Sequence, residues 1–292
     1  MFSKIPNITY LSNEPLKNHC SFKIGGNARF FISTHTIDAL LDTIHACNQH
    51  SIPYKILGGG SNILFDDLGY NGVIIKYDNK VKYFKENKLF ASSGCSLAEI
   101  IQFCQQNNLS GFEFATGVPA LLGGAIINNL GAYEQSISDY VEYITILKNN
   151  RIIYLNKDDC NFRYHFSNLQ NQNLIILGAI FNMPSLDKEI SKQKCIEYFS
   201  KRKTSQPLEL PNAGSIFRRD KNILPAKLID DLNLKGLTIN QAQVSNKHCG
   251  FIVNLGNAKS KDVLRLIEII KNKIYDNFKV NLSLEIEYLS YL

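Results

Sequence analysis

The sequence lacks several features that define whole classes of protein. Its seven cysteines are scattered, odd in number and without a C-x-x-C pair, which argues against a disulfide framework and against a zinc site. No apolar run approaches the ~18 residues of a membrane helix. Residues 1–15 have no continuous apolar core of the signal-peptide type. We therefore expect a cytoplasmic protein that works in a reducing compartment, binds no metal and contacts no membrane.

Charge is also sparse. Charged residues make up 20% of the 292 residues, the net charge is +6, and there is no long basic run. This balance suits a site for an anionic small molecule and gives no support for a nucleic-acid surface. The hydrophobic fraction of 45% is typical of a globular protein, and the length allows two or three domains with a substantial core.

What the sequence does have is glycine in two unusual stretches. In the first, Gly58, Gly59 and Gly60 follow the apolar run Tyr54–Leu57 and precede Ser61 and Asn62. Such a loop after a strand can turn several backbone N–H groups toward one anion, such as a diphosphate. It is neither a phosphate loop, because no Lys-Ser/Thr follows, nor a Rossmann loop, because the third glycine and the helix are missing. The alternative is a tight turn between two strands.

The second stretch is GFEFATGVPALLGGAIINNLGAY, residues 111–133. Its glycines at positions 117, 123, 124 and 131 are too many for one helix. The segment indicates backbone packed closely against something flat or large, or alternatively a glycine-rich core crossing. Two such stretches beside strands favour an extended cofactor with a phosphate at one end and a ring at the other.

Hydrophobic periodicity predicts the remaining elements. Thr36 should cap a helix over residues 37–50, and Ser96-Leu-Ala-Glu99 is a capping box that starts another. Further helices are predicted over residues 186–202 and 261–278. Strands are predicted over residues 54–57, 73–76, 81–84, 89–92, 140–147, 151–155 and 174–183, with a strand pair in 241–254. A closing strand over residues 280–288 should place Ser283, Glu285 and Glu287 on one face.

A third candidate segment is Asn212–Arg219, in which Ser215 follows Asn-Ala-Gly. A serine at such a turn has freedom to place its hydroxyl. Basic residues accompany it at positions 201–203, 218 and 219, and they either hold an anion or form a solvated face.

Together these motifs resemble the UDP-N-acetylenolpyruvoylglucosamine reductase family, the flavoenzymes that complete UDP-N-acetylmuramate for bacterial peptidoglycan. The resemblance covers nearly the whole chain. It rests on SFKIGGNA (21–28), LGGGSNIL (57–64), the 111–133 stretch, QPLELPNAGSIFRR (206–219), KGLTINQAQVSNKHCGFIVN (235–254) and NLSLEIEYL (281–289). The joint occurrence of these motifs in this order is highly specific.

The resemblance implies an α+β fold with a two-part FAD-binding domain of the vanillyl-alcohol-oxidase/PCMH type and a C-terminal α/β substrate-binding domain. We expect the FAD-binding parts at residues 1–72 and 73–184 and the substrate-binding domain at residues 185–292. The short interval after Ser215 suggests the compact form, without the extra substrate-domain insertion. We expect a monomer.

The resemblance also implies the chemistry. NADPH would reduce FAD, and hydride would pass from flavin N5 to the β-carbon of the enolpyruvyl ether of UDP-N-acetylglucosamine enolpyruvate, a small-molecule substrate. Ser215 matches the proton-donating serine of the family. Glu285 matches the catalytic glutamate, with Glu287 as the alternative register. A serine is a weak acid, so a neighbouring carboxylate or cation must support its proton delivery.

The catalytic arginine is where the sequence departs from the family. The family pattern Phe-x-Tyr-Arg-x-Ser appears here as Phe162-Arg163-Tyr164-His165-Phe166-Ser167. Alignment on the tyrosine places His165 at the arginine position, and a shifted register places Arg163 there. On a strand, residues 163 and 165 would share one face. We favour Arg163, because guanidinium is permanently charged and can grip the substrate carboxylate with two bonds.

The remaining site residues also follow from the resemblance. Gly58, Gly59, Gly60, Ser61 and Asn62 should hold the FAD diphosphate, and Gly117, Gly123, Gly124 and Ala125 should lie along the flavin. Tyr133, Lys203, Arg219 and Asn254 are candidate contacts to substrate or nicotinamide phosphate groups. Two departures affect cofactor contacts: the family's Pro-Gly-Thr is Pro119-Ala120-Leu121 here, and its glycine after Ala-Tyr is Glu134.

These departures keep two alternative functions open. The first is a related FAD oxidoreductase with another substrate. The second is a non-catalytic nucleotide-sugar-binding relative, which the joint presence of Ser215 and Glu285 argues against.

Overall fold

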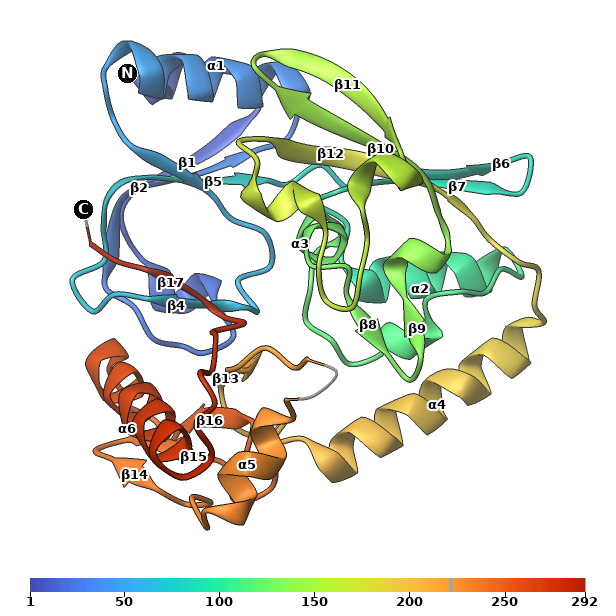
Figure 1. The fold of residues 1–292 in the computed structure, drawn as a ribbon. Helices are drawn as coiled ribbons and strands as arrows, with labels where there is room; N and C mark the ends of the chain where they lie inside the picture. Colours follow the sequence, from blue (N-terminus) through green and yellow to red (C-terminus); the bar gives the residue numbers. More distant parts are fainter. Residues whose placement is uncertain (221–222, 292) are drawn as a thin grey trace. The chain divides into compact units, whose positions relative to one another are not determined.

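The computed structural model describes residues 1–220 and 223–291, and its helices and strands confirm the α+β prediction (Figure 1). The chain divides into two compact units, each built from three segments. Unit 1 comprises Met1–Leu11, Phe31–Gly59 and Ile74–Arg202, and unit 2 comprises Ser12–Phe30, Gly60–Val73 and Lys203–Leu292. The domain boundaries expected after residues 72 and 184 stay a prediction.

Unit 1 holds a five-stranded antiparallel sheet in the order β11-β10-β12-β7-β6. Its strands are β6 (Lys82–Lys85), β7 (Lys88–Ser92), β10 (Val141–Lys148), β11 (Arg151–Asn156) and β12 (Ile175–Asn182). Each lies where the sequence predicts a strand. Two-residue turns join β6 to β7 and β10 to β11, and all four turn residues have positive φ, which matches the right-handed twist of the strands.

A second sheet has the order β1-β2-β5-β3. Its strands are β1 (Ile8–Pro15), β2 (Asn27–Thr34), β3 (Tyr54–Ile56) and β5 (Tyr70–Tyr77). The chain passes from one unit to the other within β1, β2 and β5, and again after Gly59. Strand β1 has mostly exposed side chains, so it carries little periodic signal, and the sequence did not predict it.

The helices of unit 1 begin where their caps predict. Helix α1 (Ile37–Gln49) starts after Thr36, whose hydroxyl accepts the N–H of Ala39 at 3.1 Å. Helix α2 (Leu97–Gln106) starts at the predicted capping box, in which Ser96 and Glu99 bond reciprocally. Helix α4 (Lys188–Ser205) runs from unit 1 to the start of unit 2.

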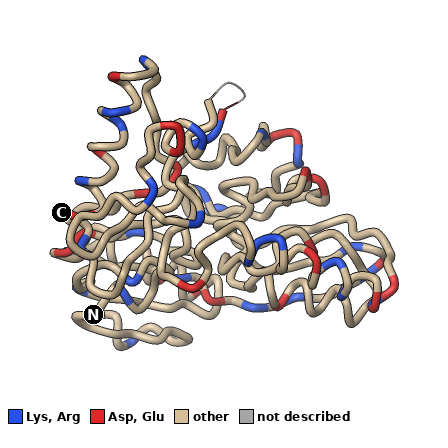
Figure 2. The backbone as a smooth tube through the Cα atoms, turned by 90° about the horizontal axis from the view of Figure 1, so that it is seen from below, with Lys and Arg blue, Asp and Glu red and all other residues tan. Residues whose placement is uncertain are grey.

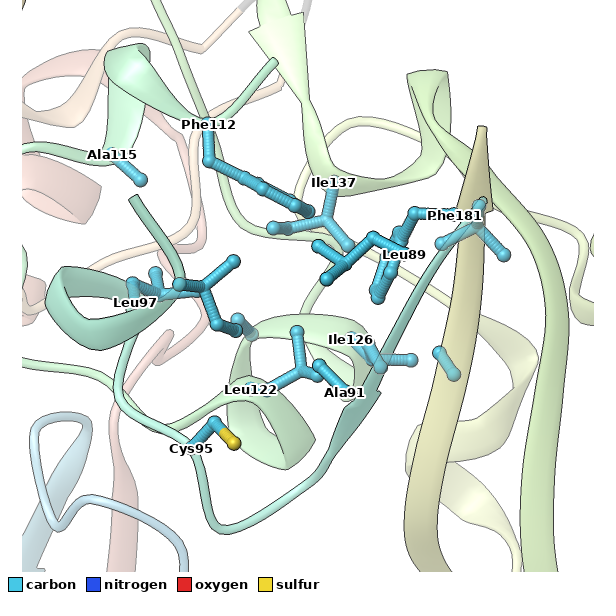
Figure 3. Close-up of a cluster of buried hydrophobic side chains, with 14 of the residues drawn as sticks. Leu89, Ala91, Cys95, Leu97, Phe112, Ala115, Leu122, Ile126, Ile137 and Phe181 are labelled. Carbon is cyan, nitrogen blue, oxygen red and sulfur yellow. The ribbon is translucent and has the colours of Figure 1, made fainter. Parts of the chain in front are cut away.

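The glycine-rich segment contains a short helix that the sequence did not predict, α3 (Leu122–Ile127). Its apolar residues join the main core of unit 1, which also receives α2 and the five-stranded sheet (Figure 3). The core members labelled in Figure 3 are Leu89, Ala91, Cys95, Leu97, Phe112, Ala115, Leu122, Ile126, Ile137 and Phe181. Part of the 111–133 stretch thus crosses the core, which agrees with the alternative interpretation of a glycine-rich core crossing.

Unit 2 contains a four-stranded antiparallel sheet in the order β13-β16-β15-β14 and a parallel pair β17-β4. The strands are β4 (Ile63–Phe65), β13 (Asn212–Ser215), β14 (Thr238–Ile239), β15 (Ala242–Val244), β16 (Phe251–Asn254) and β17 (Glu287–Leu289). The helices are α5 (Pro225–Asp231) and α6 (Ser260–Phe278). Helix α6 buries its predicted stripe of Val263, Leu266, Ile267, Ile270 and Ile274.

The closing strand is much shorter than the sequence predicts. Residues 280–286 are irregular apart from a single bridge between Leu284 and Phe217, and regular pairing starts only at Glu287. Leu282 and Ile286 are buried as the alternation requires. The alternation therefore gave the burial correctly but not the strand, because this segment bonds to residues 216–218 through one bridge rather than a ladder.

Basic and acidic residues are interspersed along the chain (Figure 2). Within residues 1–220 and 223–291, no helix is long and apolar enough to cross a bilayer. In the same residues, no group of three or more His, Cys, Asp or Glu side chains is arranged to hold a metal ion.

Candidate active site

The two glycine-rich stretches meet in unit 1. A Cβ added to Gly59 would lie 3.0 Å from the nitrogen of Leu121 and 3.1 Å from the carbonyl oxygen of Pro119, and one added to Gly58 would lie 3.7 Å from the nitrogen of Gly124. The contact is therefore backbone against backbone, and at Gly59 a side chain would force the two segments apart. Residues predicted independently from distant parts of the sequence thus form one surface.

Part of this surface is open backbone. A Cβ on Gly124 would meet no atom within 4 Å, so the backbone of α3 is open there. Gly123 lies against Ser93, whose carbonyl oxygen accepts the N–H of Gly123 at 3.0 Å, and Ala125 is buried. Bare backbone around open space is what a ring or a diphosphate needs for close approach. Glycines 58, 59, 123 and 124 are the residues of unit 1 that would hold FAD.

Gly117 has a different set of neighbours. Its φ is +82°, and a Cβ there would lie 3.0 Å from Phe199 Cδ2 and 3.3 Å from Arg202 Cδ of helix α4. Gly117 therefore lets α4 approach the glycine-rich segment. A contact between Gly117 and flavin stays a prediction.

The departures from the family pattern have unequal structural consequences. Ala120 does not adopt a positive φ, so alanine fits where the family has glycine. Glu134 has φ +64° and follows Tyr133 at φ +53° in the two-residue turn between β8 (Gly131–Ala132) and β9 (Gln135–Ser136). A glutamate in this left-handed conformation is strained, whereas glycine is not.

The rest of the first glycine loop belongs to unit 2. Gly60 has φ +66°, its carbonyl accepts the N–H of Ser21 at 3.0 Å, and a Cβ would lie 2.0 Å from the carbonyl oxygen of His19. Only glycine fits at such a close backbone approach. Asn62 then binds the closing segment: its Nδ2 donates to the carbonyl oxygen of Glu285 at 3.0 Å, and its carbonyl accepts the N–H of Glu287 at 2.9 Å. Ser61 is half-buried between them.

Ser215 and Glu285 lie on adjacent segments of unit 2. Ser215 ends β13 opposite Phe251 of β16, after an irregularity in the pairing at Gly214, where φ is +79°. On its other side, the N–H of Glu285 donates to the carbonyl oxygen of Ile216 at 2.8 Å, and the N–H of Arg218 donates to Ser283 at 2.9 Å. Both Ser215 and Glu285 are half-buried. The structure thus makes the segment that carries Ser215 and the segment that carries Glu285 neighbours, and their role in proton transfer stays a prediction.

The two registers of the glutamate differ in surroundings. Glu287 is exposed and pairs with Ile63 in the β17–β4 ladder. Glu285 is half-buried and pairs through its backbone with the residue after Ser215. The choice between Glu285 and Glu287 as the partner of Ser215 stays a prediction.

The Arg163 segment is a tight turn rather than a strand. The N–H of Arg163 donates to the carbonyl of Phe166 at 2.9 Å, the reverse bond measures 3.1 Å, and His165 has φ +49°. The expectation that residues 163 and 165 share a strand face was wrong, because the chain reverses between them. Arg163 is exposed, while the His165 ring stacks on Tyr164 and its Nε2 lies 3.2 Å from the carbonyl oxygen of Gly131.

The weaker candidates fall into two groups. Tyr133 in unit 1 and Lys203 and Arg219 in unit 2 are exposed, as residues that meet a ligand should be. Asn254 is 1% exposed; its Nδ2 donates to Phe22 and its Oδ1 accepts the N–H groups of Gly256 and Ala258. These bonds favour a structural role for Asn254, joining the 21–28 motif to the end of β16.

A histidine beside Ser215's strand partner was not singled out from the sequence. His248 Nδ1 accepts the N–H of Gly250 at 3.1 Å, and the Gly250 carbonyl accepts the N–H of Ile216 at 2.9 Å. Burial lowers the pKa of His248, and the nearby Lys235 charge lowers it further. The neutral ring therefore stabilises the turn on which the Ser215 segment rests. A lone histidine in a loop gave no pattern that could have revealed this.

The comparisons with known proteins agree with these observations. Residues 206–289 match the family model described as UDP-N-acetylenolpyruvoylglucosamine reductase, C-terminal domain, and residues 28–151 match an FAD binding domain. The curated UDP-N-acetylenolpyruvoylglucosamine reductase of Clostridium botulinum (strain 657 / Type Ba4) is 39% identical over 98% of this chain and 94% of its own length. That of Clostridium novyi (strain NT) is 38% identical over 94% and 90%.

A solved structure is similar throughout. The crystal structure of UDP-N-acetylenolpyruvylglucosamine reductase from Thermus caldophilus superimposes with a TM-score of 0.80, at 27% identity, over 96% of this chain and 98% of that one. The contact between the two glycine-rich stretches agrees with these matches, which show the family. This chain belongs to the UDP-N-acetylenolpyruvoylglucosamine reductase family.

Proposed function

We propose that this chain reduces UDP-N-acetylglucosamine enolpyruvate to UDP-N-acetylmuramate with NADPH, through bound FAD, in peptidoglycan precursor synthesis. FAD, when bound, supplies the hydride-transfer chemistry between NADPH and the enolpyruvyl ether. The observation that supports the proposal is the backbone hydrogen bond from Glu285 to Ile216, the residue after Ser215, since it makes the segments that carry these two residues neighbours in a chain with an FAD-binding domain.

Each site residue has its own role in the proposed reaction. Ser215 gives the proton that the α-carbon requires once hydride has reached the β-carbon, and Glu285 supports this transfer as a neighbouring carboxylate. Arg163 holds the substrate carboxylate, where negative charge builds up as hydride adds. Tyr133, Lys203 and Arg219 contact the nucleotide sugar or the phosphate groups of the nicotinamide nucleotide. Glycines 58–60 with Ser61 and Asn62 hold the FAD diphosphate.

We further propose a cytoplasmic monomer. All seven cysteines are free thiols in the structure, as expected for a reducing compartment. Burial raises the pKa of Cys104 to about 12 and that of Cys47 to about 11, so these two thiols are unreactive. Size-exclusion chromatography with light scattering measures the molar mass and so tests whether the protein is a monomer.

An anaerobic two-step experiment tests the function. The purified protein is checked for flavin absorbance, reduced with NADPH, and mixed with UDP-N-acetylglucosamine enolpyruvate while flavin reoxidation is followed. Rapid reoxidation with formation of UDP-N-acetylmuramate is the expected result. A flavin that NADPH reduces but this substrate leaves reduced would point to an oxidoreductase with another substrate. Nucleotide-sugar binding without flavin reduction would point to a non-catalytic relative.

A further inference from the structure

Helix α4 presents an aromatic side chain to Tyr133. The rings of Tyr133 and Tyr198 stack with centroids 4.7 Å apart and planes inclined by 23°, and the Tyr133 hydroxyl donates to the carbonyl oxygen of Tyr198 at 3.3 Å. Tyr198 is half-buried, whereas Tyr133 keeps 37% of its surface exposed. Both residues belong to unit 1.

A second side chain of α4 reaches the same ring. Arg202 lies one helical turn after Tyr198, so the two share a face of α4, and its guanidinium carbon is 5.8 Å from the Tyr133 ring centroid. Arg202 is only 7% exposed and donates to the carbonyl oxygens of Thr116 at 3.1 Å and Phe114 at 3.3 Å. It therefore fixes this end of α4 to the glycine-rich segment.

Hydrogen bonds hold Tyr198 in turn. Gln135 Nε2 donates to the Tyr198 hydroxyl at 3.1 Å, and the Tyr140 hydroxyl donates to Gln135 Oε1 at 3.3 Å. Near the start of α4, the Ser191 hydroxyl donates to Oε1 of the buried Glu113 at 2.7 Å. Helix α4 is thus anchored at both ends, and the Tyr198 ring has a fixed position.

The turn that carries Tyr133 has an unfavourable backbone conformation. Tyr133 and Glu134 both have positive φ, a conformation that costs free energy for residues other than glycine. An exposed ring on a strained turn is held only when its surroundings determine it. The side chains that hold it come from α4, and Tyr198 is 65 residues farther along the chain than Tyr133.

We infer that Tyr198 is a positioning residue for substrate binding: it presets the ring of Tyr133 in the orientation that contacts the nucleotide sugar. The inference rests on the proposed function, in which Tyr133 is a substrate contact. Presetting lowers the ordering that binding requires, so its loss weakens binding rather than the chemical step. Stacked aromatic pairs contribute ~0.5–1.5 kcal/mol, which corresponds to a roughly 3- to 10-fold change in affinity.

Calorimetric titration of the oxidised holoenzyme with UDP-N-acetylglucosamine enolpyruvate, together with anaerobic reoxidation at a series of substrate concentrations, tests this role. Tyr198→Leu should raise Kd and the half-saturating concentration roughly 3- to 10-fold and leave flavin content and the limiting rate unchanged. Tyr198→Phe keeps the stack and loses only the hydrogen bond from Gln135, so it should raise Kd less than Tyr198→Leu does. The matched control is Tyr154→Leu, which alters a well-exposed tyrosine on β11 of the same unit.

A double-mutant cycle makes the test specific. In a Tyr133→Ala background, Tyr198→Leu should cause no further loss of affinity, because the ring that Tyr198 orients is absent. Unchanged affinity in Tyr198→Leu, or additive losses in the double variant, would overturn the inference while the wild-type reaction stands. A wild-type enzyme that neither binds this substrate nor is reoxidised by it would overturn the proposed function, and the inference with it.

Discussion

The backbone N–H of Glu285 donates a 2.8 Å hydrogen bond to the carbonyl oxygen of Ile216, the residue that follows Ser215. The N–H of Ile216 donates to the carbonyl oxygen of Gly250, and Asn62 Nδ2 donates to the carbonyl oxygen of Glu285 at 3.0 Å. Hydrogen bonds to the backbone therefore hold the two segments that carry the proposed proton-transfer residues. Such support fixes catalytic groups more tightly than a loop would.

Removal of the Ser215 hydroxyl should separate the two half-reactions. In Ser215→Ala, NADPH should still reduce the flavin at close to the wild-type rate, while reoxidation by the enolpyruvyl substrate slows by ~10²–10⁴-fold, the usual contribution of a general acid. Stopped-flow absorbance under anaerobic conditions measures both rates. Ser283→Ala, on the exposed side of the neighbouring segment, is the matched control and should retain both. Equal loss of both half-reactions would contradict the role given to Ser215.

Arg163 and His165 can be separated by pH. Arg163→Ala should lower kcat/KM for the enolpyruvyl substrate by about 10²-fold, because a fixed positive charge near the developing negative charge is lost. His165→Ala should have a much smaller effect. Histidine loses its charge between pH 5 and 8, whereas arginine does not. If Arg163 holds the substrate carboxylate, its charge should cause no change in wild-type kcat/KM over that range. A rate that falls as histidine deprotonates, together with an inactive His165→Ala, would transfer the role to His165.

The turn at Tyr133-Glu134 offers a stabilising substitution. Glu134 has φ +64°, so Glu134→Gly should raise the free energy of unfolding by ~0.5–1 kcal/mol through relief of the left-handed strain. Urea denaturation followed by circular dichroism measures the change. Glu134→Ala removes the same charge but keeps Cβ, and it should bring no such gain. A gain of equal size in both variants would assign the effect to charge instead.

His248 should make stability depend on pH. Its pKa is lowered in the folded state by burial, and its Nδ1 accepts the N–H of Gly250. Its contribution is fully present above the unfolded pKa of 6.5 and is lost as pH falls toward the lower folded value, since the unfolded chain takes up the proton first.

Urea denaturation at pH 7.5 and 5.5 tests this expectation. In His248→Gln the free energy of unfolding should fall less between these pH values. The half-buried ring is partly screened by solvent, so the difference should stay below the one-proton limit of about 1.4 kcal/mol per pH unit. His50→Gln, at the end of α1, is the control. An unchanged pH slope in His248→Gln would contradict the assignment.

Local signals predicted the helices well. Thr36 and the Ser96–Glu99 box mark helix starts through their own hydrogen bonds, so a few neighbouring residues suffice to identify them. The two glycine-rich motifs likewise indicated segments that lie against each other in the structure, and the family motifs pointed to Ser215 and Glu285, which lie on adjacent segments. Both depend on residue types, glycine above all, that only particular backbone conformations require.

Features determined by distant partners were not predictable in this way. The turn at Arg163–Phe166 resembles a strand in sequence because its residues are aromatic and basic, and the left-handed His165 carries no glycine or asparagine signal. The closing segment alternates like a strand but has one bridge, since its partner Phe217 lies in an equally irregular stretch. The stack of Tyr198 on Tyr133 depends on where α4 passes, which no local pattern reports.

The division of the chain into units has a consequence for synthesis on the ribosome. Unit 2 needs residues 12–30 and 60–73 from the start of the chain and everything from Lys203 onward. Strand β4 has its β17 partner more than 200 residues away, and Asp67 accepts the first N–H groups of α6 across 193 residues. Strand β4 and Asp67 therefore lack these partners until the ribosome has made α6 and β17. A nascent chain that has not reached residues 203–289 contains the early segments of unit 2 without the partners that complete this unit.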